Sequence, residues 1–307
     1  MNMTGKLERL QQACSGVKMR CQEPLAEHTS FRIGGPADLM LFPSSEEELA
    51  QILRACQRLE LKPVILGAGT NVLAPDEGLR GAVVCTRDCL TGMERRGETE
   101  IAVKSGVTLA KAAMYAYELG LTGLEFAQGI PGTVGGGVYM NAGAYGGEIR
   151  QVAVSTTVLL PDGTEKTFAA EAQAFSYRHS AFMETDCVIT RTVFRLAPGD
   201  RTAIKARMKE LADRRCASQP LELPSAGSTF KRPVGGYAAA LIQQAGLKGF
   251  RVGGAAISEK HAGFVVNCGG ATAQDVLSLM EQVQQRVYDH SGIRLEPEVR
   301  ILTNPEV

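Results

Sequence analysis

The sequence GIPGTVGGGVYMNAGAYGG, at residues 129–147, carries eight glycines among mostly small side chains. A residue without a Cβ adopts positive φ readily and leaves its backbone N–H uncovered. Consecutive N–H groups turned inward bind anions, and a following helix start adds partial positive charge. A flexible linker is the alternative, but linkers usually carry Ser, Gln, Lys or Glu in place of residues such as Val134 and Val138. The segment therefore predicts a phosphate-binding turn rather than part of a hydrophobic core.

A second glycine turn lies in PVILGAGTNVL, at residues 63–73, where a predicted buried strand runs directly into Gly67. The pattern resembles a dinucleotide-binding G-x-G-x-x-G motif, but its third glycine position is occupied by Val72. The residues that follow also argue against an immediate helix. What remains is a tight turn whose N–H groups, with the hydroxyl of Thr70 and the amide of Asn71, suit a phosphate.

The whole chain has 307 residues, 44% of them apolar, enough for two or three modest domains that each bury a core. The formal net charge is zero, so no overall field attracts nucleic acid or an anionic membrane. No apolar run approaches the roughly 20 residues that span a bilayer, and the N-terminus lacks the apolar segment of a signal peptide. We therefore expect a cytoplasmic protein without nucleic-acid, membrane or obligate protein partners.

Eight cysteines are scattered along the chain without a CxxC pair, and none of the four histidines groups with them. In a long chain without an export signal, such cysteines are expected to be reduced and mostly to serve packing. No metal site is predicted, because the ligand spacing of one is missing. The cysteines are Cys14, Cys21, Cys56, Cys85, Cys89, Cys187, Cys216 and Cys268.

Local patterns predict mixed helices and strands, with a first β–α–β unit ending at Gly67. Two capping-box signals are Ser45 with Glu48, before a helix to Leu59, and Thr272 with Asp275, before a helix to Tyr288. The turn Asp162-Gly163 predicts a hairpin over residues 152–170. Other helices are predicted in residues 3–14, 108–119, 201–217 and 236–245, and other strands in residues 39–42, 82–85, 100–103, 187–196, 252–266 and 295–302.

Seven motifs follow one another from about Thr29 to the C-terminus: TSFRIGGPADLM, ILGAGTNVL, GIPGTVGGGVYMNAGAYGG, FSYRHS, SAGSTFKRP, GGAAISEKHAGFVVN and LEPEVR. In this order they resemble the UDP-N-acetylenolpyruvoylglucosamine reductase family, in its subclass with a short chain between the flavin and substrate domains. The resemblance implies an α+β chain with a two-part FAD-binding domain of the vanillyl-alcohol-oxidase (PCMH) type. The implied parts are an N-terminal helical segment (1–27), the FAD-binding domain (28–199, with subdomains of about 28–85 and 86–199) and an α+β substrate domain (200–307) whose last strand returns to the active site.

The same resemblance implies non-covalent FAD as cofactor, NADPH as reductant, and reduction of UDP-N-acetylenolpyruvoylglucosamine to UDP-N-acetylmuramate for peptidoglycan precursor synthesis. The two glycine turns should then wrap the FAD diphosphate, in agreement with the phosphate sites predicted from the glycines. The implied FAD-binding residues are Gly67, Ala68, Gly69, Thr70, Asn71, Val72, Leu73, Pro131, Gly132, Thr133, Gly135, Gly136, Asn141, Ala142 and Gly143.

Three residues match the catalytic set of the family: Arg178 in SYRHS, Ser228 in AGSTF and Glu298 in LEPEVR. Hydride addition to the enol ether leaves an enolate, a strong base that a serine hydroxyl can protonate when it is held within reach. Arg178 suits the carboxylate that gains charge, whereas Glu298 can donate to the same oxygen only in its protonated form. Taken singly, each of the three would more often be an ordinary turn, surface or solvated residue.

Position-matching also implies substrate contacts from Tyr145, Arg178, Arg215 and Arg232. Arg215 lies at the end of a predicted basic helix, whose charges would ordinarily form a solvated face. The sequence departs from its relatives here, because Cys216 and Ser218 occupy a stretch in which they often carry a lysine before the Gln-Pro pair. One expected phosphate contact is therefore in doubt.

Two alternative functions remain open at this point. A sugar or aldonolactone oxidase on the same fold usually places a histidine for covalent flavin attachment in its glycine loop, and the residues around Asn71 offer none. A non-catalytic flavin or nucleotide-sugar binding protein needs no proton donor, so Arg178, Ser228 and Glu298 together argue against it.

Overall fold

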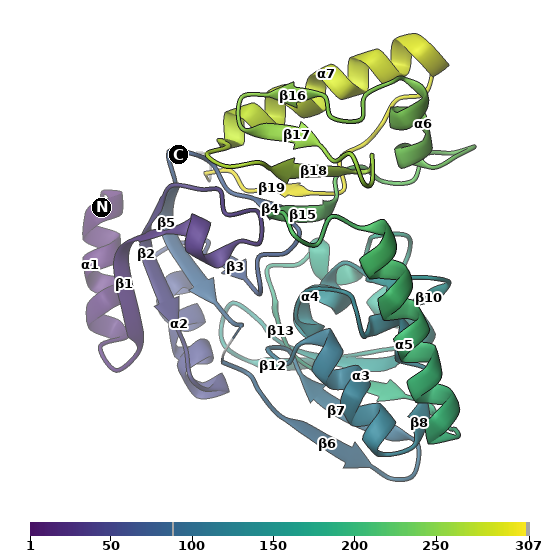
Figure 1. Cartoon of the computed structure of the whole chain (residues 1–307). Coiled ribbons are helices and arrows are strands. Elements are labelled where there is room, and N and C mark those ends of the chain that lie inside the picture. The colour runs from purple at the N-terminus through teal and green to yellow at the C-terminus, as the bar shows by residue number, and fades with distance from the viewer. Residues whose placement is uncertain (88, 305–307) are drawn as a thin grey trace. The chain divides into compact units, whose positions relative to one another are not determined.

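The computed structural model describes residues 1–87 and 89–304 (Figure 1). The chain groups into two compact units. Unit 1 consists of residues 1–21, 39–68 and 81–215, and unit 2 consists of residues 22–38, 69–80 and the chain from Cys216 onward. The two units are groups of residues that pack together, and they are not defined by a bound ligand. The predicted division into FAD and substrate domains therefore stays a prediction.

The N-terminal part of unit 1 places two helices beside a four-stranded sheet of order β1-β2-β5-β3. Strands β3 and β5 are parallel, with Val64 opposite Val83. Fully buried side chains of the helices, including Leu10, Leu49 and Ile52, form one core with this sheet. The bounds are α1 Met3–Ala13, β1 Lys18–Pro24, β2 Pro36–Phe42, α2 Glu46–Arg58, β3 Val64–Leu66 and β5 Leu79–Cys85. The turn η1 Leu25–His28 belongs to unit 2, as do residues 22–24 of β1, 36–38 of β2 and 79–80 of β5.

The predicted start of α2 is confirmed, since the hydroxyl of Ser45 accepts a hydrogen bond from the Glu48 N–H at 3.2 Å. The reciprocal partner differs from a capping box, because the Glu48 carboxylate accepts from the N–H of Ser44 at 2.6 Å. Strand β3 is less buried than predicted: Leu66 is buried, but Ile65 is 37% exposed. An apolar run alone did not reveal that this strand lies at the end of its sheet.

The larger part of unit 1 contains a five-stranded sheet of order β12-β11-β13-β7-β6, antiparallel at every pairing. The predicted hairpin is confirmed by the β11–β12 pairing, in which Leu159 lies opposite Glu165. Helices α3 and α4 share a core with this sheet. The bounds are β6 Met93–Arg96, β7 Glu100–Lys104, α3 Leu109–Glu118, β8 Leu121–Thr122, η2 Glu125–Ala127, α4 Val134–Tyr139, β9 Gly143–Ala144, β10 Gly147–Glu148, η3 Ile149–Gln151, β11 Ala153–Leu159, β12 Glu165–Ala169, η4 Glu171–Gln173, η5 Ala181–Met183, β13 Val188–Arg195 and β14 Ala197–Pro198.

Helix α5, Arg201–Ser218, confirms the predicted basic helix. Its exposed charges pair along its own surface, Arg207 with Glu210 at 2.6 Å and Lys209 with Asp213 at 2.5 Å. This is the ordinary solvated face. Arg215 departs from it and is buried.

Unit 2 has a four-stranded sheet of order β15-β18-β17-β16, covered by helices α6 and α7 through a core that includes Ile242, Val276 and Val283. Thr272 and Asp275 form the predicted capping box of α7, which ends at Gly292 with φ +70°. The bounds are β4 Val72–Leu73, β15 Ser225–Ser228, α6 Ala238–Gln244, β16 Arg251–Val252, β17 Ala255–Ile257, β18 Phe264–Asn267, α7 Ala273–Ser291 and β19 Arg300–Ile301.

The predicted C-terminal strand over residues 295–302 is much shorter in the structure. Only Arg300 and Ile301 form a strand, parallel to Val72 and Leu73, and Pro297 makes an isolated bridge with Phe230. The Lys231 N–H donates to the Glu296 oxygen and the Glu298 N–H to the Thr229 oxygen, both at 2.8 Å, so the segment changes its pairing partner between Glu298 and Arg300.

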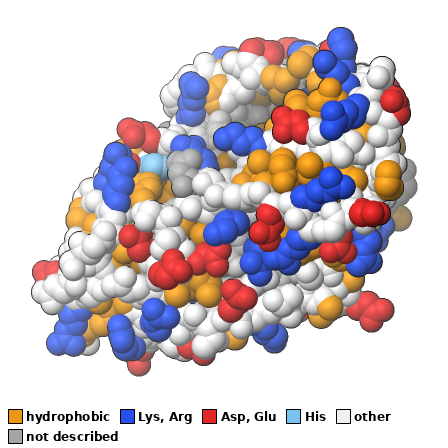
Figure 2. All heavy atoms as spheres, turned by 90° about the horizontal axis from the view of Figure 1, so that it is seen from below, with side chains coloured by type: hydrophobic (Ala, Val, Ile, Leu, Met, Phe, Trp, Pro, Cys, Tyr) orange, Lys and Arg blue, Asp and Glu red, His pale blue; other side chains and the backbone are white. Residues whose placement is uncertain are grey.

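None of the helices in the described ranges combines the length and the apolar character needed to cross a bilayer. Figure 2 shows basic and acidic side chains mixed over one face, as expected for a chain with a net charge of zero.

Candidate active site

The glycine-rich segment, residues 129–147, is built around the short helix α4 in unit 1. Thr133 begins this helix, and its hydroxyl accepts from the N–H of Gly136 at 3.4 Å. Val134 and Val138 are fully buried in the core of unit 1, so the prediction that the segment takes no part in a core is wrong. One side of α4 packs inward, and Gly136 on the helix remains exposed.

Several glycines of this segment are required by packing. A Cβ at Gly135 would lie 2.8 Å from the Cβ of Ser105, and a Cβ at Gly147 would lie 2.5 Å from the ring of Phe126. A Cβ at Gly143 would lie 2.7 Å from the backbone oxygen of Gly147. The absence of side chains thus lets neighbouring elements approach α4 and the β9–β10 hairpin closely.

The first half of the other glycine turn lies beside α4. A Cβ at Gly67 would be 3.0 Å from the Thr133 hydroxyl oxygen, so unit 1 brings Gly67 next to the helix start. Ser105 adds a buried hydroxyl that has no hydrogen-bond partner within the described part of the chain, and its carbonyl accepts from the N–H of Gly135 at 2.9 Å. The N–H groups of Val134 and Gly135 already donate to backbone oxygens, so it is the neighbouring glycine turn and the uncommitted hydroxyl that fit a diphosphate-bearing cofactor such as FAD.

The second half of the turn, residues 69–73, belongs to unit 2. Gly69 has φ +63°, and a Cβ there would lie 2.1 Å from the backbone oxygen of His28. The Ser30 N–H donates to the Gly69 oxygen at 3.0 Å. Beyond it, strand β4 pairs with β19, and the Arg300 N–H donates to the Asn71 oxygen at 3.0 Å. Backbone hydrogen bonds therefore fix this half of the turn.

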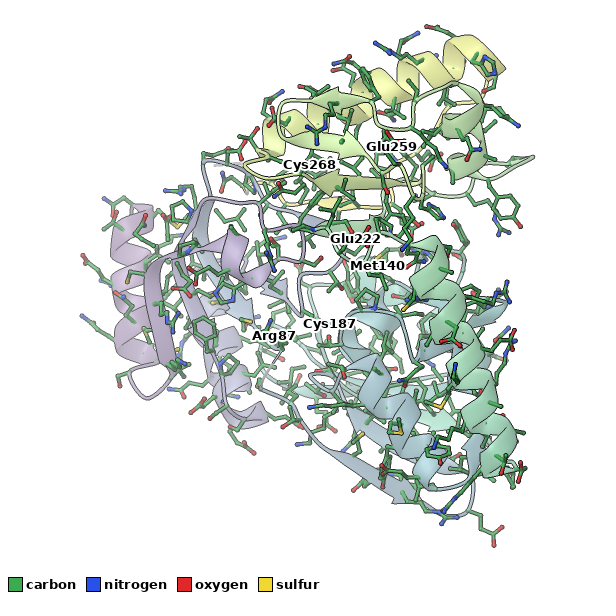
Figure 3. All side chains as sticks on the ribbon, viewed as in Figure 1. Arg87, Met140, Cys187, Glu222, Glu259 and Cys268 are labelled. Atoms are coloured by element: carbon green, nitrogen blue, oxygen red, sulfur yellow. The ribbon has the colours of Figure 1, made fainter. Side chains whose placement is uncertain are left out.

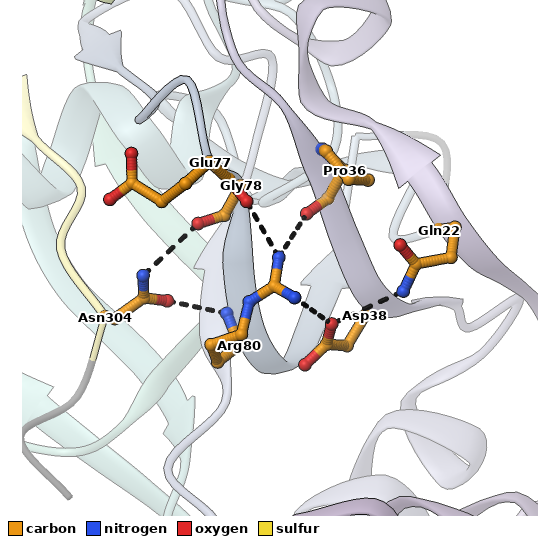
Figure 4. A network of polar contacts seen from close by, with 7 residues as sticks. All are labelled: Gln22, Pro36, Asp38, Glu77, Gly78, Arg80 and Asn304. Atoms are coloured by element: carbon orange, nitrogen blue, oxygen red, sulfur yellow. Dashed lines mark hydrogen bonds and ion pairs between the residues drawn. The ribbon is translucent and has the colours of Figure 1, made fainter.

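Arg80 secures the end of the same loop through the network in Figure 4. Its guanidinium lies 2.9 Å from the Asp38 carboxylate and donates to the Glu77 oxygen at 2.8 Å. Its backbone N–H donates to the Asn304 side chain at 2.6 Å, and the Asn304 amide donates to the Gly78 oxygen at 3.3 Å. Three separate stretches of unit 2 thus meet at one arginine.

The predicted catalytic residues fall in different units. Arg178 lies in unit 1, is half-buried and has φ +55°. Its guanidinium donates to the Gly143 oxygen at 3.3 Å. The neighbouring Ser176 oxygen accepts from the Asn141 amide at 2.8 Å, so the SYRHS turn is joined to the NAGA turn.

Ser228 and Glu298 lie together in unit 2. Ser228 is exposed at the end of β15, and the N–H of Glu298 donates to the oxygen of the adjacent Thr229 at 2.8 Å. The Asn71 amide donates to the Glu298 backbone oxygen at 3.3 Å. Unit 2 therefore joins the loop at Asn71 to both residues through one set of hydrogen bonds.

The predicted substrate contacts have different surroundings. Arg232 is exposed and lies over the ring of Tyr237, 4.2 Å from its centroid. Arg215 is only 6% exposed and donates to the backbone oxygen of Gly129. Tyr145 is half-buried, with the guanidinium carbons of Arg214 and Arg215 at 5.0 and 5.7 Å from its ring centroid. Tyr237 was not predicted as a site residue from the sequence, although an aromatic residue directly after the Gly235-Gly236 pair is a signal that could have indicated it.

Ser105 was also missed at the sequence level. It follows strand β7 directly and precedes the helix cap at Thr108, an arrangement typical of a residue at a strand–helix turn. Its position beside Gly135 depends on contacts distant in sequence.

The cysteines are all free thiols, as predicted, but only half of them are buried. Burial raises the pKa of Cys56 and that of Cys89 to about 12. In Figure 3, Cys187 lies at the start of β13 and Cys268 lies just after β18, where it is exposed. A group with potential metal ligands, Glu23, Glu27 and His28, occurs in unit 2, where the His28 ring is 2.8 Å from the Glu23 carboxylate.

Comparison with known proteins assigns the chain in two parts. Residues 37–169 match an FAD binding domain, and residues 219–302 match the C-terminal domain of UDP-N-acetylenolpyruvoylglucosamine reductase. The UDP-N-acetylenolpyruvoylglucosamine reductase of Syntrophomonas wolfei is 43% identical over 285 residues, which cover 93% of this chain and 95% of that protein. The protein of that name from Streptococcus pneumoniae (strain 70585) is 45% identical over 295 residues, 96% of this chain and 97% of that protein.

A solved structure gives the same assignment. The UDP-N-acetylenolpyruvylglucosamine reductase of Thermus caldophilus is 34% identical and has a TM-score of 0.80, covering 94% of this chain and 99% of that one. The chain belongs to the UDP-N-acetylenolpyruvoylglucosamine reductase family. The predicted α+β fold class, with an FAD-binding domain of the vanillyl-alcohol-oxidase type, is confirmed, and FAD is the cofactor.

Proposed function

We infer that this protein uses NADPH and FAD to reduce UDP-N-acetylenolpyruvoylglucosamine to UDP-N-acetylmuramate, a step of peptidoglycan precursor synthesis in the cytoplasm. Relatives named for this reductase activity match more than nine-tenths of the chain. The observation that carries the proposal is in unit 2, where Ser228, Glu298 and the turn at Asn71 share one hydrogen-bonded framework.

Bound FAD supplies hydride transfer from NADPH to the methylene carbon of the enol ether. The chain's part is to hold the cofactor. At one turn, the hydroxyls of Thr133 and Ser105 offer donors to a diphosphate. At the other, the backbone of residues 69–71 does the same, held in place by the β4–β19 pairing.

Ser228 is the proposed proton donor. When hydride reaches the methylene carbon, the adjacent carbon carries the negative charge of an enolate and must take up a proton. An enolate is basic enough to be protonated by an alcohol positioned within hydrogen-bond distance. Ser228 is exposed, with a neighbouring glycine, Gly227, at φ +77°, so its hydroxyl is accessible to a bound substrate.

Arg178 and Glu298 are proposed to stabilise the charge that this reaction moves into the substrate carboxylate. A guanidinium is permanently charged and binds a carboxylate through two parallel donors. A protonated Glu298 would add a third hydrogen bond to the developing oxyanion. Hydrogen bonds to backbone oxygens hold both residues: the Arg178 guanidinium donates to Gly143, and the Glu298 N–H donates to Thr229.

The nucleotide-sugar diphosphate is assigned to Arg232, with Tyr145 as a covering contact. Arg232 is exposed and its guanidinium is already oriented by the ring of Tyr237. A planar guanidinium stacked on an aromatic ring keeps its edge donors available for phosphate oxygens.

The test is an activity assay of the purified holoenzyme. We expect NADPH to be oxidised only when the enolpyruvyl sugar nucleotide is present, with a product heavier by two hydrogen atoms in mass spectrometry. Oxygen consumption driven by sugars alone would favour an oxidase, and tight binding of the sugar nucleotide without turnover would favour a binding protein. Either result would contradict the proposal.

A further inference from the structure

Arg215 is buried, whereas the other lysines and arginines of α5 are exposed. It lies in the last turns of α5 and is 6% exposed, whereas its neighbour Arg214 is exposed and 3.7 Å from the Glu210 carboxylate. Burying a guanidinium is unfavourable unless its donors and its face are used. The partners of Arg215 therefore indicate what the residue does.

The first partner is the start of the glycine-rich segment. The Nη1 group of Arg215 donates to the backbone oxygen of Gly129. A Cβ at Gly129 would lie 3.0 Å from Nε and 3.1 Å from Cδ of Arg215, so this position tolerates a side chain only if the arginine moves. Glycine at residue 129 and arginine at residue 215 are thus a matched pair.

The second partner is near the other end of the segment. The Arg215 guanidinium carbon lies 5.7 Å from the ring centroid of Tyr145, within the range of a cation–π contact. Tyr145 has φ +53°, a left-handed conformation that a residue with a side chain adopts only when its surroundings impose it. The guanidinium of Arg215, together with that of Arg214 at 5.0 Å from the same ring centroid, is part of those surroundings.

We propose that Arg215 is a positioning residue that holds both ends of the glycine-rich segment, and so fixes the FAD-binding turn at Thr133, instead of contacting the substrate phosphates. This inference rests on the proposed function only in that the segment binds FAD. Between Gly129 and Tyr145 lies all of α4, so a guanidinium that fixes the two residues also fixes the helix start between them. The role differs from the phosphate contact that the sequence predicted for Arg215.

The experiment compares FAD affinity with substrate affinity in three variants: Arg215→Met, Arg215→Lys and Gly129→Ala. We expect Arg215→Met to raise the FAD dissociation constant by about 10-fold or more, the effect of losing a charge-assisted hydrogen bond and an aromatic contact. At saturating FAD, the KM for the sugar nucleotide should change by less than about 3-fold. Arg215→Lys keeps the charge but not the planar face, so its loss should be intermediate.

Gly129→Ala approaches the same contact from the other side. Its added methyl displaces the arginine without altering any basic group, so it should also weaken FAD binding. Because both changes disrupt one contact, the double variant with Arg215→Met should be no worse than the poorer single variant. Arg207→Met is the control on the same helix, and we expect its FAD dissociation constant to lie within about 2-fold of wild type because its pairing with Glu210 is exposed.

The outcomes are separable. If KM rises more than the FAD dissociation constant in the Arg215 variants, the inference is overturned in favour of a phosphate contact. Unchanged FAD affinity in Gly129→Ala would also overturn it. If Arg215→Met fails to fold, Arg215→Lys and Gly129→Ala decide the matter by the same criteria. Wild-type protein that does not bind FAD would instead refute the proposed function.

Discussion

Residues 129–147 and residues 69–80 both carry glycines, but they are held in place by different means. In the first segment, several glycines face side chains, as Gly137 faces Leu109 and Gly147 faces Phe126, although Gly143 also meets a backbone oxygen. In the second, glycines face backbone carbonyls, with a Cβ at Gly78 only 1.9 Å from the Pro36 oxygen. Side chains can move by rotation, whereas a hydrogen-bonded backbone cannot. The loop of unit 2 should therefore be the less tolerant of the two.

The two regions also carry different parts of the proposed chemistry. The segment in unit 1 supplies α4 and accepts a hydrogen bond from Arg178, the proposed binder of the substrate carboxylate. The loop in unit 2 is joined through Asn71 to Glu298, whose N–H bonds to the residue next to Ser228, the proposed proton donor. Changes in unit 2 should thus separate proton transfer from cofactor binding.

The largest effect is expected from Ser228→Ala. Loss of the proton donor should slow oxidation of the reduced enzyme by substrate by about 10²- to 10⁴-fold, the usual contribution of a general acid. Reduction of the enzyme by NADPH should stay nearly unchanged. Rapid-mixing spectroscopy of each half-reaction measures both, and an equal loss in the two would argue against the assignment.

Gly78→Ala should give the largest loss of stability. The residue has φ +80°, and its new methyl would collide with the Pro36 backbone. Strain and overpacking together predict a loss of about 2–4 kcal/mol in the free energy of unfolding. Gly137→Ala is the control from unit 1: its Cβ meets only Leu109 methyls at 3.0 and 3.1 Å, and alanine favours the helix. Urea unfolding that ranks the two variants in the opposite order would contradict the comparison.

Asp76→Ala should have a smaller effect. The Asp76 carboxylate accepts from the N–H groups of Ala273 at 2.7 Å and Gln274 at 3.0 Å, at the N-terminus of α7. Loss of this second cap should reduce the free energy of unfolding by about 1 kcal/mol, because the residue is largely exposed. Glu77→Ala, one residue further on and also exposed, should be neutral. Thermal melts that do not separate the two variants would refute the capping role.

Thiol labelling tests the packing of the cysteines, and of these experiments it should affect function least. Cys21, Cys216 and Cys268 are exposed and should react with a maleimide at neutral pH. Cys56 and Cys89 should not, because burial raises each pKa to about 12 and leaves almost no thiolate. Peptide mapping by mass spectrometry after brief labelling checks this, and modification of Cys56 in the folded protein would contradict the packing.

Local elements were predicted well because their signals are local. Ser45, Thr108 and Thr272 all accept the helix-capping hydrogen bonds that their sequence positions indicate. The hairpin over residues 152–170 follows from its Asp162-Gly163 turn in the same way. The C-terminal strand was predicted too long because the segment changes its pairing partner between Glu298 and Arg300, which depends on contacts distant in sequence.

What the sequence could not show depends on long-range packing. Gly67 and Gly69 lie two residues apart, yet they belong to different compact units. The basic helix gave no sign that Arg215, and not Arg214, is buried. The glycines of residues 129–147 suggested ligand binding alone, whereas Gly135 and Gly147 are also needed for packing. The motif resemblance supplied the candidate residues, and the structure shows what supports each of them.

The central claim is tested most directly by an anaerobic titration of the purified protein, first with NADPH and then with UDP-N-acetylenolpyruvoylglucosamine, following the flavin spectrum. We predict that NADPH bleaches the visible flavin absorbance and that one equivalent of the sugar nucleotide restores it. A colourless protein that does not take up added FAD, or a reduced flavin that the sugar nucleotide leaves bleached, would contradict the account.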